Sequence, residues 1–139
     1  MAKNTGKIAL FCYECAIYPC LLLIIGSLHR FPQDPNIMMK IYSEFGNIIF
    51  NSIYAGFVEE AAFRVVLFGW LKQYSKLWAY IISSIIFSLV HYQWRVFEWN
   101  SFCFRVEAGL FFALIYQYRG YLKAAISHSI YDIIVGLSP

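Results

Sequence analysis

An apolar run from Ile48 to Leu71 carries three ionisable side chains near its middle, Glu59, Glu60 and Arg64. A run of this length can cross a bilayer as a helix. An ionisable side chain at the bilayer centre costs roughly 2.5–3.5 kcal/mol to insert, so it nearly always faces a partner or a hydrated cavity. These three residues are therefore the first candidates for chemistry in the chain.

Helical spacing gives the three side chains different roles. Glu60 and Arg64 are four residues apart, so they lie on one helix face and can pair. Glu59 points about 100° away, because a helix has 3.6 residues per turn. It is left without a local partner, which suits a general base that takes a proton from water. The alternative is a structural ion pair that joins two helices, with Glu59 facing a water pocket.

Two further apolar segments carry proton-active side chains. His91 lies toward the end of Leu77–Phe97, and His128 and Asp132 lie within Tyr121–Leu137. His128 and Asp132 are again four residues apart, so the acid can fix the tautomer of the ring. A carboxylate and two imidazoles around one hydrated pocket are suited to activating a water molecule.

These residues are compatible with two ways of activating the water molecule. Glu59 can take the proton directly, or Glu59, His91 and His128 can together bind a zinc ion that activates the water. Each histidine also has a structural explanation. His91 can lie among lipid headgroups, and His128 with Asp132 can form a hydrogen-bonded pair or part of a proton relay. The catalytic hypothesis depends on three separate helices bringing these groups to one place.

The composition is that of a membrane protein. Of the 139 residues, 60% are hydrophobic and 14% are charged, whereas soluble domains have about 25% charged residues. The formal net charge of +3 is spread over short loops, so no nucleic-acid partner is predicted. Four cysteines include the pair Cys12-x-x-Cys15, but no second such pair follows, and we interpret them as small residues facing lipid or other helices.

The hydropathy pattern predicts an all-α fold, a polytopic transmembrane bundle of about five spans with a polar cavity, in a single domain over residues 1–139. The spans are expected at Ile8–Leu28, Ile48–Leu71, Leu77–Phe97, Val106–Tyr118 with a helix start by Phe104, and Tyr121–Leu137.

One of the predicted connections is long. It is the polar segment His29–Asn47, whose middle, Ile37–Phe45, is predicted to form a short interfacial helix. Trp99–Arg105 is predicted to be a turn. In the first span, Pro19 is expected to kink the helix. Glu14 is expected among the headgroups or, alternatively, at the polar cavity.

Three motifs follow one another on separate apolar spans. They are Glu59-Glu60-x-x-x-Arg64, Phe87-x-x-x-His91 and His128-x-x-x-Asp132. In this order they resemble the motifs of the CAAX protease and bacteriocin-processing family of intramembrane proteases, over roughly residues 48–137. The resemblance implies hydrolysis of a peptide bond presented at the membrane. By this resemblance, Glu59 would activate the water that His91 helps to hold. His128 and Asp132 would stabilise the oxyanion. Glu60 and Arg64 would organise the site.

The resemblance leaves the cofactor and the substrate open. Members are described both as metal-dependent and as glutamate-dependent, so zinc bound by Glu59, His91 and His128 stays an alternative to a metal-free site. Many members carry Asn at the position of Asp132, and an Asp donates to an oxyanion only when protonated. The expected role of Asp132 is therefore to orient His128 or to accept a hydrogen bond from the backbone. Three substrates stay open: a prenylated tail, a bacteriocin leader and a sorting tail. The short chain suggests self-association.

The expected location is a bacterial inner membrane, with the lipid bilayer and a peptide or protein substrate as partners. One side of the predicted bundle holds six basic residues, against four on the other side, which favours a cytoplasmic N-terminus. The six are Lys3, Lys7, Lys72, Lys76, Arg119 and Lys123, and the four are Arg30, Lys40, Arg95 and Arg105.

Two functions of other classes stay open. One is a non-catalytic membrane immunity or partner-binding protein that keeps the motif network. The other is a small proton or ion transporter that uses a Glu/His relay. The sequence has no inverted repeat and no pair of broken helices, which disfavours the transporter.

Overall fold

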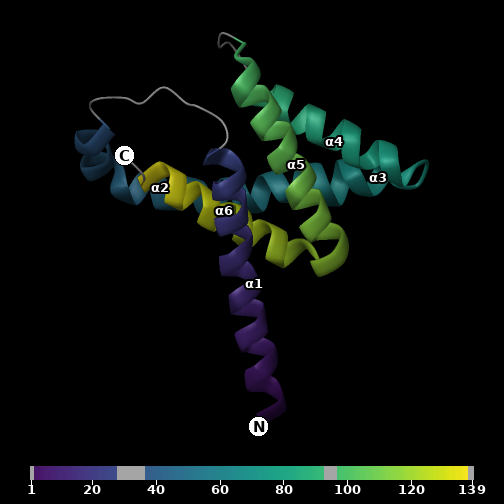
Figure 1. Cartoon of the computed structure of the whole chain (residues 1–139), viewed down its shortest axis with the longest axis horizontal. Helices are drawn as coiled ribbons and strands as arrows, with labels where there is room; N and C mark the ends of the chain where they lie inside the picture. Colours follow the sequence, from purple (N-terminus) through teal and green to yellow (C-terminus); the bar gives the residue numbers. More distant parts are fainter. Residues whose placement is uncertain (1, 28–36, 93–96, 138–139) are drawn as a thin grey trace.

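The computed structural model describes residues 2–27, 37–92 and 97–137, and these form a bundle of helices without a strand (Figure 1). Helices α2, η1 and α3 follow one another without a break and make one long rod. The elements are α1 (Ala2–Ser27), α2 (Ile37–Glu60), the π-helix η1 (Ala61–Phe68), α3 (Gly69–Leu71), α4 (Lys76–Val90), α5 (Trp99–Arg119) and α6 (Tyr121–Leu137).

The all-α fold class is confirmed, and each predicted span has a corresponding helix. By length and hydropathy, one described helix, Gly6–Ser27, qualifies as a candidate membrane span, and Lys76–Val90 is a shorter apolar helix. The number of spans and their orientation stay predictions. Pro19 lies inside α1, which is one α-helix from Ala2 to Ser27.

Two predicted connections are wrong. Residues 37–45 do not form a separate interfacial helix, because α2 starts at Ile37 and continues through them. No proline or glycine occurs between Ile37 and Phe45, so nothing in the local sequence ends the helix there.

The predicted turn Trp99–Arg105 is instead the first part of α5. The Ser101 hydroxyl donates to Glu98 Oε2 at 2.9 Å, and the Tyr92 hydroxyl donates to the Glu98 carbonyl at 2.8 Å. These contacts place an acidic side chain at the helix N-terminus, where the helix dipole favours it. The polar residues taken for a turn therefore mark a helix start. Helix α4 ends at Val90, earlier than predicted, and residues 93–96 lie outside the described residues.

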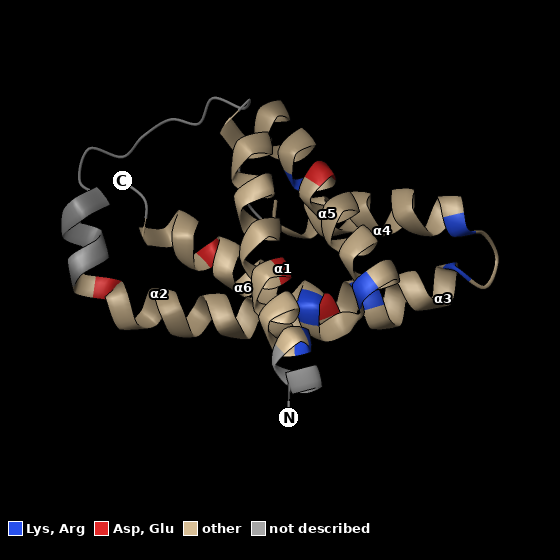
Figure 2. Cartoon of the chain, turned by 60° about the horizontal axis from the view of Figure 1, so that its bottom comes forward, with Lys and Arg blue, Asp and Glu red and all other residues tan. Residues whose placement is uncertain are grey.

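Glu14 does not line the polar cavity, which was the alternative position expected for it. It is buried on α1 and pairs with Arg119 Nε at 3.2 Å and with the Lys123 ammonium group. The two cations flank Gly120, the residue between α5 and α6, so this cluster attaches α1 to the α5–α6 corner. Figure 2 marks the charged positions along the helices.

Small residues let α6 approach α2 and α5 approach α4. Gly56 of α2 packs against Ala125 and Ser129 of α6, and Gly109 of α5 packs against Ser84 of α4. Backbones that meet at small residues can come close together, as is common between membrane helices. The contact between α2 and α6 is the most extensive in the bundle, and both run side by side in Figures 1 and 2.

The outer surface of the bundle is apolar. Every long helix exposes large hydrophobic side chains, whereas several serines are buried inside. Such an inverted distribution is expected where the surroundings are lipid. Among the exposed side chains are Ile8, Ile24, Phe50, Val66, Trp70, Leu77, Trp99, Leu114 and Leu122.

Adding a methyl group at Gly56 tests the close approach of α2 and α6. A Cβ there would lie 2.7 Å from the Ser129 backbone nitrogen and 2.9 Å from the Ala125 carbonyl oxygen. Gly56→Ala should therefore lower stability by about 1–3 kcal/mol, the usual cost of overpacking. Thermal unfolding in detergent measures the change. Gly46→Ala is the control on the same helix, because a Cβ there meets nothing within 4 Å. An unchanged midpoint for Gly56→Ala would contradict the packing.

Candidate active site

A buried ion pair on the long rod lies beneath the site. Arg64 Nε donates to Glu60 Oε2 at 3.1 Å, and neither side chain is exposed. The guanidinium carbon of Arg64 lies 5.1 Å from the centre of the Phe87 ring, a cation–π distance. The spacing of four residues thus pairs the two charges as predicted, even though Arg64 lies in η1, whose turns are wider than those of an α-helix.

Glu60 also contacts His128 of α6. Its Oε1 lies 3.1 Å from His128 Nδ1, and since a carboxylate paired with an arginine can only accept, Nδ1 carries the proton and donates. Glu60 therefore fixes the ring orientation of a residue 68 positions away along the chain. The sequence assigned this role to Asp132, but Asp132 Oδ2 lies 3.4 Å from the other ring nitrogen, Nε2.

His91, at the C-terminus of α4, faces Glu59. His91 Nδ1 lies 2.7 Å from the Phe87 carbonyl oxygen, which only accepts, so Nδ1 is the donor. In the neutral ring Nε2 then carries a lone pair, and this nitrogen lies 3.5 Å from Glu59 Oε2. Glu59 and His91 are each part-exposed, at 27% and 30%.

Glu59 Oε2 lies between the two histidines. It is 3.5 Å from His91 Nε2 and 4.0 Å from His128 Nε2, both longer than an ordinary N–H···O bond of roughly 2.7–3.2 Å. Among the described residues this oxygen has no hydrogen-bond partner. Glu59 is therefore the carboxylate without a strong local partner, as the helical spacing predicts.

Two phenylalanines hold the histidine rings. Phe112 of α5 stacks on His128 with ring centres 4.5 Å apart and planes 17° apart. Phe87 meets His91 at 4.8 Å and the edge of His128 at 5.8 Å. These contacts limit the rotation of both rings, so the nitrogens keep their positions relative to Glu59.

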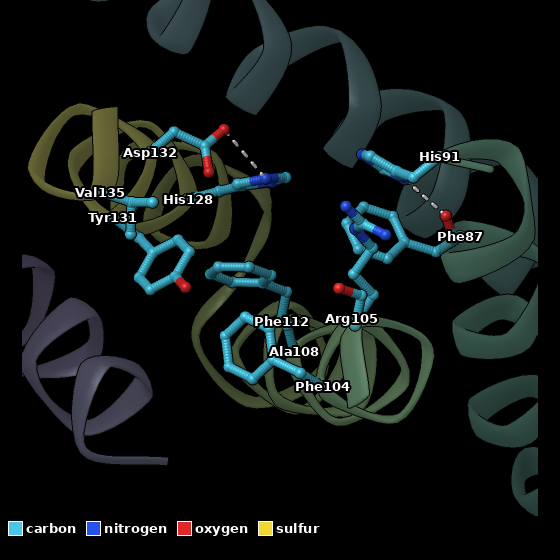
Figure 3. Close-up of a pocket in the computed structure, with 11 residues that line it drawn as sticks. Phe87, His91, Phe104, Arg105, Ala108, Phe112, His128, Tyr131, Asp132 and Val135 are labelled. Atoms are coloured by element: carbon cyan, nitrogen blue, oxygen red, sulfur yellow. Dashed lines mark hydrogen bonds and ion pairs between the residues drawn. The ribbon is translucent and has the colours of Figure 1, made fainter. Parts of the chain in front are cut away.

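A cavity of about 320 Å³ opens beside the two histidines, between α4, α5 and α6 (Figure 3). Asp132 and His128 lie on one side of it, and His91 and Phe87 lie on the other. Its volume is within the range of small-ligand sites. The lining residues are Phe87, His91, Ser101, Phe104, Arg105, Ala108, Phe112, His128, Tyr131, Asp132 and Val135.

The six predicted site residues form one continuous cluster, but α5 contributes two residues that the sequence analysis missed. Phe112 lies against His128, and Arg105 lines the cavity. Phe112 carries no signal in a chain with 13 phenylalanines. Arg105 could have been found, because placing the helix start at Trp99 makes it a cation inside a helix rather than a loop charge.

The zinc alternative stays a prediction. No group of three or more His, Cys, Asp or Glu residues in the described part of the chain is arranged to hold a metal ion. Glu59, His91 and His128 lie near one another, and the contact of His128 Nδ1 with Glu60 leaves Nε2 as the nitrogen that could bind a metal.

Acids and histidines gathered inside an apolar helical bundle fit the class of membrane-embedded hydrolases. The family model described as type II CAAX prenyl endopeptidase, Rce1-like, matches residues 42–134. This is more than half of the chain, so the protein belongs to the Rce1-like family of intramembrane proteases, and the resemblance inferred from the three motifs is confirmed. Neither the curated proteins nor the solved structures contain a match to the chain.

Removing the charge of Glu60 tests the ion pair beneath the site. Glu60→Gln keeps the shape of the side chain but leaves the buried Arg64 cation without its carboxylate. Breaking a buried pair in this way costs about 3–5 kcal/mol. We expect a correspondingly lower unfolding midpoint in detergent. Glu44→Gln, at an exposed position on the same helix, is the control. Equal stability of the two variants would contradict the structural role of Glu60.

Proposed function

We propose that this protein is an intramembrane endopeptidase in which Glu59 activates a water molecule for attack on a peptide bond. One observation carries the proposal. Glu59 Oε2 and His91 Nε2 face each other at 3.5 Å, and in the neutral His91 ring, with Nδ1 donating to Phe87, both atoms are acceptors. Two acceptors that face each other need a donor between or beside them, and a water molecule supplies two O–H groups.

The proposed reaction begins when Glu59 takes a proton from this water. The oxygen attacks the carbonyl carbon, and the carbonyl electron pair moves to its oxygen. When the tetrahedral intermediate collapses, the C–N bond breaks and protonated Glu59 returns the proton to the leaving amine. One water is consumed, and one carboxyl and one amino terminus form.

His128 is proposed to stabilise the oxyanion. Its Nδ1 is held by Glu60, so Nε2 is the nitrogen that faces the cavity, beside Glu59 and Asp132. Because Nδ1 already carries a proton, a second proton on Nε2 makes the ring an imidazolium, whose Nε2–H can donate to developing negative charge, as in other oxyanion sites. Asp132, 31% exposed and 3.4 Å from Nε2, would hold this proton in place before substrate binds.

The substrate is proposed to be a peptide or protein tail presented at the membrane. Family membership supports a CAAX-type tail, and a bacteriocin leader or a sorting tail are the other candidates. The bacterial inner membrane, a cytoplasmic N-terminus and self-association belong to the same proposal. Measuring cleavage with and without a chelator separates metal-dependent from glutamate-dependent activity.

Replacing either member of the facing pair should abolish cleavage while the protein stays folded. Glu59→Gln removes the base, and His91→Ala removes the second acceptor for the water. General-base catalysis contributes about 10²–10⁴-fold, so kcat should fall by at least about 10²-fold in each. The assay uses a fluorogenic CAAX-type peptide in liposomes, and thermal unfolding monitors the fold.

Glu44→Gln again serves as the control and should cleave as the wild type does. Full activity in either site variant would rule out the assigned chemistry. A folded wild-type protein that cleaves no tested tail while Glu59 variants keep its cellular effect would favour the non-catalytic function.

Asp132 provides a separate test of the oxyanion side. Asp132→Asn keeps a side chain that can accept from His128 and adds an N–H donor, so activity should stay within about 10-fold of the wild type. Asp132→Leu removes both abilities and should lose about 10²–10³-fold in kcat, the range seen for a lost oxyanion contact. Equal activity of the Asn and Leu variants would show that Asp132 has no part in the reaction.

A further inference from the structure

Arg105 is a cation inside the cavity that the proposed reaction does not use. It lies in the second turn of α5, is partly buried, and lines the same cavity as His91 and His128. Among the described residues, no carboxylate lies within ion-pair distance of it. A guanidinium keeps its charge at any working pH, so a partly desolvated one without an acidic partner favours an anion nearby.

The contact of Arg105 with Tyr92 leaves its hydrogen-bonding edge free. The guanidinium carbon lies 5.0 Å from the centre of the Tyr92 ring, a cation–π distance that occupies a face of the planar group. The N–H donors of arginine lie in the plane, so they remain available. In Figure 3 the side chain of Arg105 extends from α5 into the cavity, toward His91 and Phe87.

The cavity therefore has a charged side chain at each of two ends. Asp132 lies at the His128 end, where its carboxylate faces His128 Nε2 at 3.4 Å, and Arg105 extends toward the opposite, His91 end. Phe104, Ala108 and Val135 contribute apolar surface to the lining. A ligand that matches this pattern carries an apolar body and one negative charge, with the charge toward Arg105.

We propose that Arg105 binds the C-terminal carboxylate of the substrate and so favours peptides with a free C-terminus. This inference rests on the proposed function, because a peptide is the ligand that reaches Glu59 and His91. A free carboxylate is the one anion that every peptide carries whatever its side chains are. Arginine pairs with a carboxylate through two parallel hydrogen bonds, which gives both affinity and direction.

The test compares two peptides that differ only at the end. A fluorogenic peptide with a prenylated cysteine and three following residues is made with a free C-terminal carboxylate and as the C-terminal amide. The wild type should cleave the acid with a kcat/KM at least about 10-fold above the amide, as expected for a charge-assisted hydrogen bond. Arg105→Gln should reduce kcat/KM for the acid peptide to the value for the amide peptide and leave kcat/KM for the amide peptide unchanged. Arg105→Lys should keep part of the preference.

Arg119→Gln is the matched control. It makes the same substitution on the same helix, but Arg119 pairs with Glu14 and does not line this cavity. The ratio of acid to amide cleavage should stay at the wild-type value in this variant. Unfolding midpoints of both variants separate a loss of recognition from a loss of fold.

Binding is measured as well, so that a failure of the proposed reaction can be told from a failure of this inference. In the Glu59→Gln background, fluorescence anisotropy should give a dissociation constant for the acid peptide at least about 10-fold below that of the amide, and Arg105→Gln should remove the difference. Equal use of acid and amide by the wild type overturns the proposal. The proposal is also overturned if Arg105→Gln lowers kcat/KM equally for the acid and the amide peptide. If the activity of the wild type then also depends on anionic lipid in the liposomes, Arg105 is assigned to a lipid phosphate.

Discussion

The geometry of the site depends on one buried carboxylate. Glu60 is fully buried, holds the Arg64 guanidinium with one oxygen and the His128 ring with the other, and so joins the long rod to α6. A buried ion is costly unless charge and hydrogen bonds compensate it. Here the arginine supplies the charge and the histidine supplies a second donor. This requirement for compensation gives His128 a single orientation, in which Nε2 faces Glu59 and the cavity.

That carboxylate can reach His128 because the helices meet closely. Gly56, four residues before Glu60 on α2, packs against Ala125 and Ser129, which flank His128 on α6. A larger residue at this crossing would separate the backbones and lengthen the contact between Glu60 and the ring. On the other side of the ring, Phe112 stacks on His128 and brings α5 into the site. Packing at small residues and aromatic stacking thus act together to place one nitrogen.

The sequence predicted which residues meet, but not how they pair. Ionisable side chains in apolar helices are costly unless they share a cavity, so the sequence alone grouped Glu59, Glu60, Arg64, His91, His128 and Asp132. Spacing of four residues describes contacts within one helix, which is why Glu60 with Arg64 was predicted and Glu60 with His128 was not. The start of α5 was missed because Asn100 and Ser101 suit a turn and a helix N-terminus equally. With that start, Arg105 was missed as well, whereas Phe112 lies inside the predicted span and was missed because nothing distinguishes it from the other phenylalanines.

The two histidines differ in the group that accepts a hydrogen bond from Nδ1, and their proposed roles follow from this difference. His91 donates from Nδ1 to a neutral carbonyl of Phe87, so its Nε2 can act as an acceptor toward water. His128 donates from Nδ1 to a carboxylate, and its Nε2 faces the further carboxylate of Asp132, so this ring is surrounded by groups that stabilise a donor. A histidine is therefore suited to holding the attacking water at position 91 and to stabilising the oxyanion at position 128. Glu59, between the two nitrogens, is the group that can move a proton from the first site to the leaving amine.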